Sequence, residues 1–273
     1  MEEIILEAGR TEKNYWKDLW RFRELFYFLA WRDILVRYKQ TVIGIAWAAL
    51  RPFLTMLIFT VLFSRVAKLQ SGGHYPYALM VMAGMLAWQF ISSSLSASSE
   101  SLVGNSNLIS KIYFPRLIVP ISSVMTSFVD LMITLGLMAI MMLWFRFLPD
   151  WRIVMLIPFL VLACACAIGV GLWLSALTVE YRDFRQVIPF IVQFGLYLSP
   201  VGFSSSVVPV RWRLLYACNP VVGIIDGFRW ALLRGEVDLD WRSILLSILI
   251  SAGFCISGVW YFRKMERTFA DVI

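Results

Sequence analysis

The stretch IVMLIPFLVLACACAIGVGLWLSALTV, residues 153–179, contains 27 consecutive residues without a charged side chain. About 20 apolar residues in a helix are enough to cross the ~30 Å hydrocarbon core of a bilayer. Because lipid offers no hydrogen-bond partners to backbone N–H and C=O groups, a single spanning segment of this kind has to be helical. The stretch therefore predicts a transmembrane helix.

Five further runs have the same character and set the expected architecture. The 273-residue chain is 60% hydrophobic and only 16% charged, whereas soluble domains average about 25% charged residues. We predict six spans, at about 42–64, 76–99, 117–145, 153–178, 187–203 and 243–262. The fold class is thus an all-α polytopic membrane protein, with an N-terminal region at 1–41 and a six-span domain at 42–273.

The basic residues predict the orientation of the spans. Residues 1–41 contain eight Lys and Arg, and the positive-inside rule then places both termini in the cytoplasm. The region between the last two spans opposes the rule with five arginines: Arg211, Arg213, Arg229, Arg234 and Arg242. The net charge of +7 is explained by orientation and by contact with anionic lipid, so we expect no nucleic acid as a partner.

Three segments outside the spans have their own patterns. Residues 15–38 mix aromatic and charged side chains, which predicts a helix at the membrane interface; the alternative is a cytosolic helix packed on another subunit. Residues 208–233 contain apolar runs too short to cross, which predicts two short re-entrant helices; the alternative is a flat surface helix. The stretch GNSNLISKIYFPRLIVP, 104–120, is a short amphipathic piece between two apolar runs.

Few residues are suited to catalysis. No glycine is followed by lysine, so the phosphate loop of ATPases is absent. The single histidine, His74, and the tripeptide Asp238-Leu239-Asp240 are best interpreted as parts of outer loops. Of the charged residues, only Arg51 and Asp130 lie well inside predicted spans, and they are candidates for an ion pair. The alternative has Asp130 bonded to hydroxyls such as Thr126 or Thr134.

Several blocks of the sequence resemble a known family. They are RDILVRYKQTVIGIAWAALRPFLTMLIFTVLF (32–63), NSNLISKIYFPRLIVP (105–120), VEYRDFRQVIPFIVQFGLYLSPVGF (179–203) and NPVVGIIDGFRWALL (219–233). They are similar to the membrane subunit of ATP-binding-cassette exporters of the type-2 permease class. Within that class they look most like the bacterial exporters of lipid-linked surface polysaccharide: O-antigen, capsule and teichoic acid.

The resemblance implies the partners and the location. The chain would form a homodimer in the bacterial inner (cytoplasmic) membrane, bound to two separate ATPase subunits that carry ATP and Mg²⁺. It would itself be a transport subunit with no cofactor, metal or catalytic residue. Residues 105–114 would be the coupling helix that contacts the ATPase, through Asn107, Leu108, Ile109, Ile112 and Tyr113. Ile109 and Tyr113 are four apart, so in a helix they would share one face.

The proposed substrate points to two further groups of residues. A pyrophosphate-linked carrier needs cations at the cytoplasmic interface, and the candidates are Arg32, Arg37 and Lys39; the alternative is bulk anionic lipid. Aromatic walls suit a polysaccharide exit path, and the candidates are Phe194, Tyr197, Phe203, Tyr216 and Trp230; the alternative is a lipid-facing aromatic belt. Two other functions stay open: export of a drug or small lipid, and a membrane-embedded enzyme of lipid-linked sugars.

Overall fold

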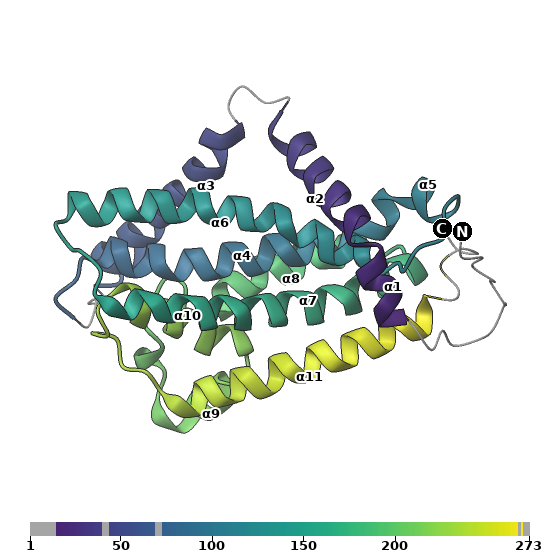
Figure 1. Cartoon of the computed structure of the whole chain (residues 1–273). Helices are drawn as coiled ribbons and strands as arrows, with labels where there is room; N and C mark the ends of the chain where they lie inside the picture. Colours follow the sequence, from purple (N-terminus) through teal and green to yellow (C-terminus); the bar gives the residue numbers. More distant parts are fainter. Residues whose placement is uncertain (1–14, 40–43, 69–72, 267–268, 270–273) are drawn as a thin grey trace.

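The computed structural model describes residues 15–39, 44–68, 73–266 and 269, and in these residues every regular element is helical (Figure 1). Five helical segments of the described chain are long and apolar enough to cross a membrane. They are α3 (Gly44–Phe59) continuing into the π-helical η1 (Thr60–Val66), α4 (Tyr77–Gly104), α6 (Ile118–Trp144), η2 (Trp151–Met155) continuing into α7 (Leu156–Glu180), and α11 (Trp241–Met265). The predicted all-helical membrane class is confirmed.

The fifth predicted span differs from the others. In place of a helix over 187–203, the structure has α8 (Phe184–Leu198), which is only 15 residues long. The segment nevertheless follows directly on the end of α7 and reaches the start of α4, because the Tyr77 hydroxyl donates to the Gly202 carbonyl oxygen at 2.6 Å. The full six-span layout therefore stays a prediction.

Helix α4 forms the centre of the bundle. In the most apolar 18 residues of each span, 83% are buried in α4, against 17% in the first span and 22% in α11. Helices α6 and α7 pack on either side of α4, and α11 packs on α7. A Cβ atom on Gly169 of α7 would lie 2.5 Å from the backbone nitrogen of Cys255 in α11. Small residues thus let the backbones of α7 and α11 approach closely, as the four-residue spacing of Ala165 and Gly169 in the sequence predicts.

The N-terminal helices and the end of α11 meet at one end of the bundle, which we call the terminal end. Helix α1 (Tyr15–Arg21) is fixed there because the Tyr15 hydroxyl donates to Glu266 at 3.0 Å. Helix α2 (Arg23–Tyr38) then packs along α6. Its last turn reaches Asp130, the thirteenth residue of the 27-residue α6. The interfacial position expected for residues 15–38 stays a prediction.

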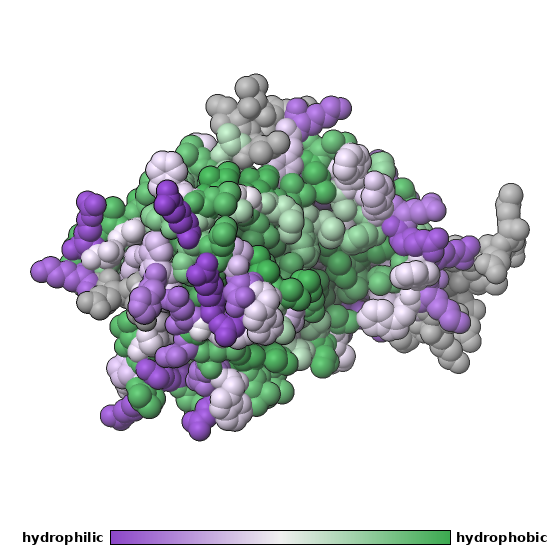
Figure 2. All heavy atoms as spheres, turned by 60° about the vertical axis from the view of Figure 1, so that its left-hand side comes forward, coloured by the Kyte–Doolittle hydropathy of each residue, from purple (hydrophilic) through white to green (hydrophobic). Residues whose placement is uncertain are grey.

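The opposite end of the bundle, which we call the distal end, contains the short helices. They are η3 (Ser205–Val207), α9 (Val210–Tyr216) and α10 (Pro220–Leu232). Most of α10 is buried against α4, α7 and α11. Figure 2 shows a wide hydrophobic surface over the middle of the molecule, with hydrophilic residues gathered toward its ends, as expected for a protein surrounded by lipid. The re-entrant path proposed for 208–233 stays a prediction.

Candidate functional site

The connection between α4 and α6 at the terminal end is the candidate coupling site. Helix α4 ends at Gly104, and Asn105 precedes the one-turn helix α5 (Ser106–Ile109). The sequence offers Asn105 or Asn107 as the cap of this helix, but the Asn105 side chain does not cap α5; its amide nitrogen donates to the Ser101 carbonyl at 2.8 Å. Its amide oxygen accepts a hydrogen bond from Arg32 of α2 at 2.7 Å. The start of the coupling segment is thereby tied to both α4 and α2.

The expected helix over 105–114 is too long, and its expected contact face is partly wrong. Only Ser106–Ile109 is helical, so Ile109 and Tyr113 do not share a helical face. Ile109 is 4% exposed and packs inside this chain, and Leu108 packs partly against the same cluster. The exposed side chains are those of Asn107, Ser110, Lys111, Ile112 and Tyr113. Ile112 is 55% and Tyr113 47% exposed, so these two form the apolar surface that a partner could cover.

A buried platform lies beneath this exposed pair. Ile109, Phe114 and Leu117 belong to one apolar cluster together with Phe262 of α11. The backbone N–H of Arg116 donates to the Glu266 carboxylate at 2.7 Å, and the Arg116 guanidinium donates to the Glu266 backbone oxygen. The coupling segment is thus fixed to the end of α11 by polar bonds and apolar packing.

Glu266 connects three helices at this platform. Its carboxylate accepts from Arg116, just before α6, and from Tyr15 of α1. Burial raises the pKa of the Glu266 carboxyl, and the bonds from Arg116 and Tyr15 oppose that shift. Burial also raises the pKa of the Tyr15 hydroxyl, and the neighbouring carboxylate adds to the effect. Sequence reasoning did not single out Glu266; its only signal was an acidic residue in a basic tail.

Asp130 forms its ion pair with α2 and not with the first span. The carboxylate lies 2.6 Å from Arg37 and also accepts a hydrogen bond from the Tyr38 hydroxyl. The expected Arg51–Asp130 pair is not formed: the ion pair of Asp130 is with Arg37, and Arg51 lies exposed on α3. The alternative is not formed either, because Thr134 donates to the backbone oxygen of Asp130 and Thr126 to Ser123.

Replacing Arg37 by alanine is expected to destabilise the protein, because the Asp130 carboxylate, 5% exposed, loses its ion-pair partner. An uncompensated charge at this depth costs about 2.5 kcal/mol even on the mildest scale. Adding Asp130→Asn removes the charge and should restore most of the loss in the thermal unfolding midpoint. Lys39→Ala, an exposed control two residues further along, should leave the midpoint unchanged. A double variant no more stable than Arg37→Ala alone would show that the pair does not stabilise the protein.

The three candidate headgroup ligands do not form one cluster. Arg32 is bonded to Asp33 and Asn105, and Arg37 to Asp130. Both arginine side chains keep an exposed fraction, 37% and 43% respectively. Lys39 is exposed. The arginines therefore have structural partners within the chain, which the sequence alone did not indicate.

The five candidate exit aromatics fall into separate places. Phe194 and Tyr197 lie exposed on α8, where Phe194 packs against Phe190 with ring centroids 4.1 Å apart. Phe203 packs beside Phe63 of η1. At the distal end, Tyr216 lines a cavity and Trp230 lies against the Arg152 guanidinium. Only the two α8 residues share an open face, so the expected aromatic wall is reduced to α8.

Comparisons with known proteins agree with this architecture. The family model of the ABC-2 type transporter membrane proteins matches residues 24–233. The chain is 24% identical over 245 residues to an O-antigen export system permease protein RfbA of Klebsiella pneumoniae, covering 89% of this chain and 92% of that one. It is also 24% identical over 260 residues to an RfbA permease of Myxococcus xanthus, covering 94% of this chain and 98% of that one. Since the family model spans well over half of the sequence, the chain belongs to the ABC-2 type transporter family of multi-pass membrane proteins.

Proposed function

We propose that this chain is the membrane subunit of an ATP-driven exporter that moves a lipid-linked polysaccharide across the bacterial inner membrane. The observation that carries the substrate assignment is the similarity to permeases named for O-antigen export, which extends over about nine-tenths of the chain. At 24% identity the individual sugars can differ, so the proposal names the class: a glycan attached to a lipid carrier.

Coupling to ATP hydrolysis would take place at the terminal end. Ile112 and Tyr113 are exposed, apolar and close to basic residues such as Lys111, while the platform beneath them is buried. A rigid base under an exposed apolar pair suits transmission of motion from a partner, because packed elements move as units. We infer that two ATPase subunits contact two copies of this chain there, with both termini in the cytoplasm.

The glycan would leave along the exposed face of α8. That face presents Phe190, Phe194 and Tyr197, which are 59%, 50% and 62% exposed in the single chain. In a homodimer, two such faces would line one path. Sugar rings have apolar C–H faces and polar edges, so aromatic walls can stack them weakly while the chain slides past.

The test is stimulation of the ATPase by substrate. The chain is purified with its co-encoded ATPase in lipid nanodiscs, and hydrolysis is measured with the host's own lipid-linked glycan, with the lipid carrier alone, and with a panel of amphipathic drugs. The proposal expects stimulation by the lipid-linked glycan and little by the other two. Stimulation by drugs and not by the glycan would contradict it and favour a drug exporter; glycan turnover by this chain without the ATPase would favour an enzyme.

A further inference from the structure

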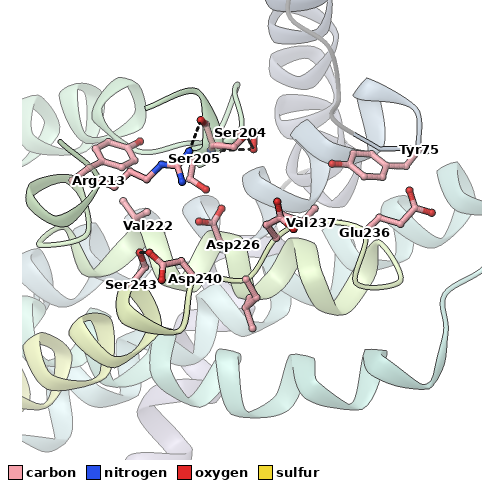
Figure 3. Close-up of a pocket in the computed structure, with 14 residues that line it drawn as sticks. Tyr75, Ser204, Ser205, Arg213, Val222, Asp226, Glu236, Val237, Asp240 and Ser243 are labelled. Carbon is pink, nitrogen blue, oxygen red and sulfur yellow. Dashed lines mark hydrogen bonds between the residues drawn. The ribbon is translucent and has the colours of Figure 1, made fainter. Parts of the chain in front are cut away.

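A polar cavity of about 200 Å³ lies at the distal end, formed by segments that are far apart in the sequence (Figure 3). Its walls come from Tyr75 just before α4, from η3 and α9, from α10, and from the loop before α11 together with the first turn of α11. Sites that enclose drug-sized ligands measure about 300–1,000 Å³. The cavity is therefore of a size for one small ring and not for an extended chain.

The lining of the cavity is acidic. It contains four carboxylates, from Asp226, Glu236, Asp238 and Asp240, and one cation, Arg213. Arg213 is already engaged, because it donates to the carbonyls of Ser206 and Val208 at 3.1 and 3.0 Å. An excess of negative charge around a small cavity repels anions. The lining thus argues against a phosphate. Since no three acidic, His or Cys side chains of the described residues are grouped so as to hold a metal ion, it favours a neutral ligand.

Three of the acidic residues have partners within the protein, and one of them, Asp226, lies beside Ser205 and Arg229. The Glu236 carboxylate accepts from the His74 backbone N–H at 2.7 Å. The Asp240 carboxylate accepts from the Arg242 backbone N–H at 3.0 Å and from the Ser243 hydroxyl at 3.2 Å. These bonds fix the wall on the side of the α11 loop. Polar atoms available to a ligand must therefore come from the opposite wall, on α9 and α10.

Two buried polar atoms of that opposite wall have no hydrogen-bond partner among the described residues: Oδ1 of Asp226 and the hydroxyl of Tyr216. Asp226 is 4% exposed, and its Oδ1 lies 3.9 Å from the nearest Arg229 nitrogen, too far for a hydrogen bond. In Figure 3 Asp226 occupies the middle of the labelled side chains. Buried polar atoms are normally bonded to protein, water or ligand, so these two atoms point to a guest in the cavity.

We propose that this cavity binds one sugar unit of the exported glycan as it emerges at the outer side, an inference that rests on the proposed function. Sugar hydroxyls donate to the Asp226 carboxylate, and they both donate to and accept from Tyr216. The rings of Tyr75 and Tyr216 offer apolar surface to the C–H groups of the sugar. Because the acidic lining excludes the carrier's pyrophosphate, the cavity takes the glycan part of the substrate and not its lipid end.

The test compares two tyrosines at the distal end. The full-length chain in lipid nanodiscs is titrated with the methyl glycosides of glucose, galactose, mannose and N-acetylglucosamine, and binding is followed by saturation-transfer NMR. At least one glycoside is expected to bind to the wild type. Tyr216→Phe should weaken its binding about fivefold, the value of one hydrogen bond. The same variant should keep the wild-type thermal midpoint, because the Tyr216 hydroxyl has no partner in the described chain to lose.

Tyr77→Phe is the matched control. It removes a hydroxyl that donates to Gly202 at 2.6 Å, so the thermal midpoint should fall while the affinity for the glycoside stays the same. Absence of binding by all four glycosides, or equal affinity in Tyr216→Phe and wild type, would overturn the proposal. ATPase stimulation by lipid-linked glycan without glycoside binding would reject the cavity site and keep the exporter. Glycoside binding without such stimulation would reject the exporter and keep the site.

Discussion

Replacing Arg229 by leucine is expected to disrupt the distal end and to produce the largest loss of stability of any single change considered for this protein. The Arg229 side chain is fully buried. It donates to the carbonyl oxygens of Met80, Val201 and Phe203, at 3.2, 2.8 and 2.9 Å respectively. It also lies 3.9 Å from the Asp226 carboxylate. Arg229 thus connects α10 to α4 and to the segment after α8.

Leucine would leave those carbonyls buried without a donor and the Asp226 carboxylate buried without its nearby cation. Removal of one member of a buried ionic network costs about 3–5 kcal/mol, so the variant should unfold at a clearly lower temperature in detergent or yield no folded protein. Arg229→Lys should be intermediate, since an ammonium cannot reproduce the planar fork of a guanidinium.

Arg211→Leu is the matched control. Arg211 is exposed on α9, with its guanidinium 5.5 Å from the Trp212 ring, and surface changes of this kind usually stay within about 0.5 kcal/mol. The thermal midpoint of both variants is measured by fluorescence-detected size exclusion after heating to a series of temperatures. Equal midpoints for Arg229→Leu and Arg211→Leu would mean that the buried network does not stabilise the distal end.

The second large effect concerns the coupling site. The double variant Ile112→Asp with Tyr113→Asp is expected to abolish co-purification of the ATPase while the chain still inserts and folds. Both side chains are about half exposed in the single chain, so the change does not disturb its core. Covering the exposed half of two such side chains contributes about 1.5–3 kcal/mol in total. Since about 1.4 kcal/mol corresponds to a tenfold change in affinity, loss of both contacts should weaken assembly by about 10- to 100-fold.

Two controls separate contact from folding. Lys111→Ala changes an exposed side chain between α5 and the apolar pair and should be mild. Ile109→Asp should instead destabilise the chain itself, because Ile109 is 4% exposed within its own core. The thermal midpoint and the amount of bound ATPase are measured for each variant. Wild-type ATPase binding by the Ile112/Tyr113 double variant would place the contact elsewhere, and the exposed face of α2 would be the next candidate.

The spans could be predicted from the sequence because lipid imposes a simple rule. A helix must be long, and almost without charge, to cross a bilayer, and the runs around residues 83 and 165 satisfy this without any knowledge of their neighbours. Glycine is a residue type that commonly ends helices, and Gly104 is the last residue of α4. The small residues of α7 meet α11 closely, also as expected, because close backbone approach needs glycine whatever the rest of the fold.

The partner of Asp130 could not be predicted in this way. The choice of Arg51 rested on depth along two spans, and the position of α2 was not known. Helix α2 mixes aromatic and charged residues and has no clear apolar stripe, so its sequence does not say on which element it packs. Only the tertiary arrangement along α6 brings Arg37 and Tyr38 to the Asp130 carboxylate.

The coupling segment shows a second limit. A continuous helix over 105–114 would place Ile109 and Phe114 about 140° apart around its axis, since successive residues turn by about 100°. Both side chains are buried in the same apolar cluster. The chain therefore leaves the helix after Ile109, which lets both residues reach the core. Local spacing cannot reveal this, because the cluster is completed by α11 from the other end of the sequence.

The arginines between α8 and α11 show a third limit of prediction from the sequence. Counted as loop charges, they oppose the positive-inside rule. In the structure Arg229 is buried against three carbonyls, Arg213 is bonded to two, and Arg234 donates to the Leu148 carbonyl. An arginine that donates to buried backbone oxygens is part of the fold. The count of such arginines in a loop then says little about the orientation of the spans in the membrane. The nearest signal was the spacing of Asp226 and Arg229, three apart on one helix.

The central claim is that this chain and an ATPase together move a lipid-linked glycan across the membrane. It is tested most directly in proteoliposomes that contain the purified complex and a fluorescent lipid-linked oligosaccharide, with ATP supplied on the side of the ATPase. Lectin accessibility reports how much glycan has reached the other side. The account predicts that ATP increases this fraction, that a non-hydrolysable ATP analogue does not, and that the Ile112→Asp, Tyr113→Asp variant behaves like the analogue. Transfer of the glycan at equal rates with and without ATP would contradict the account.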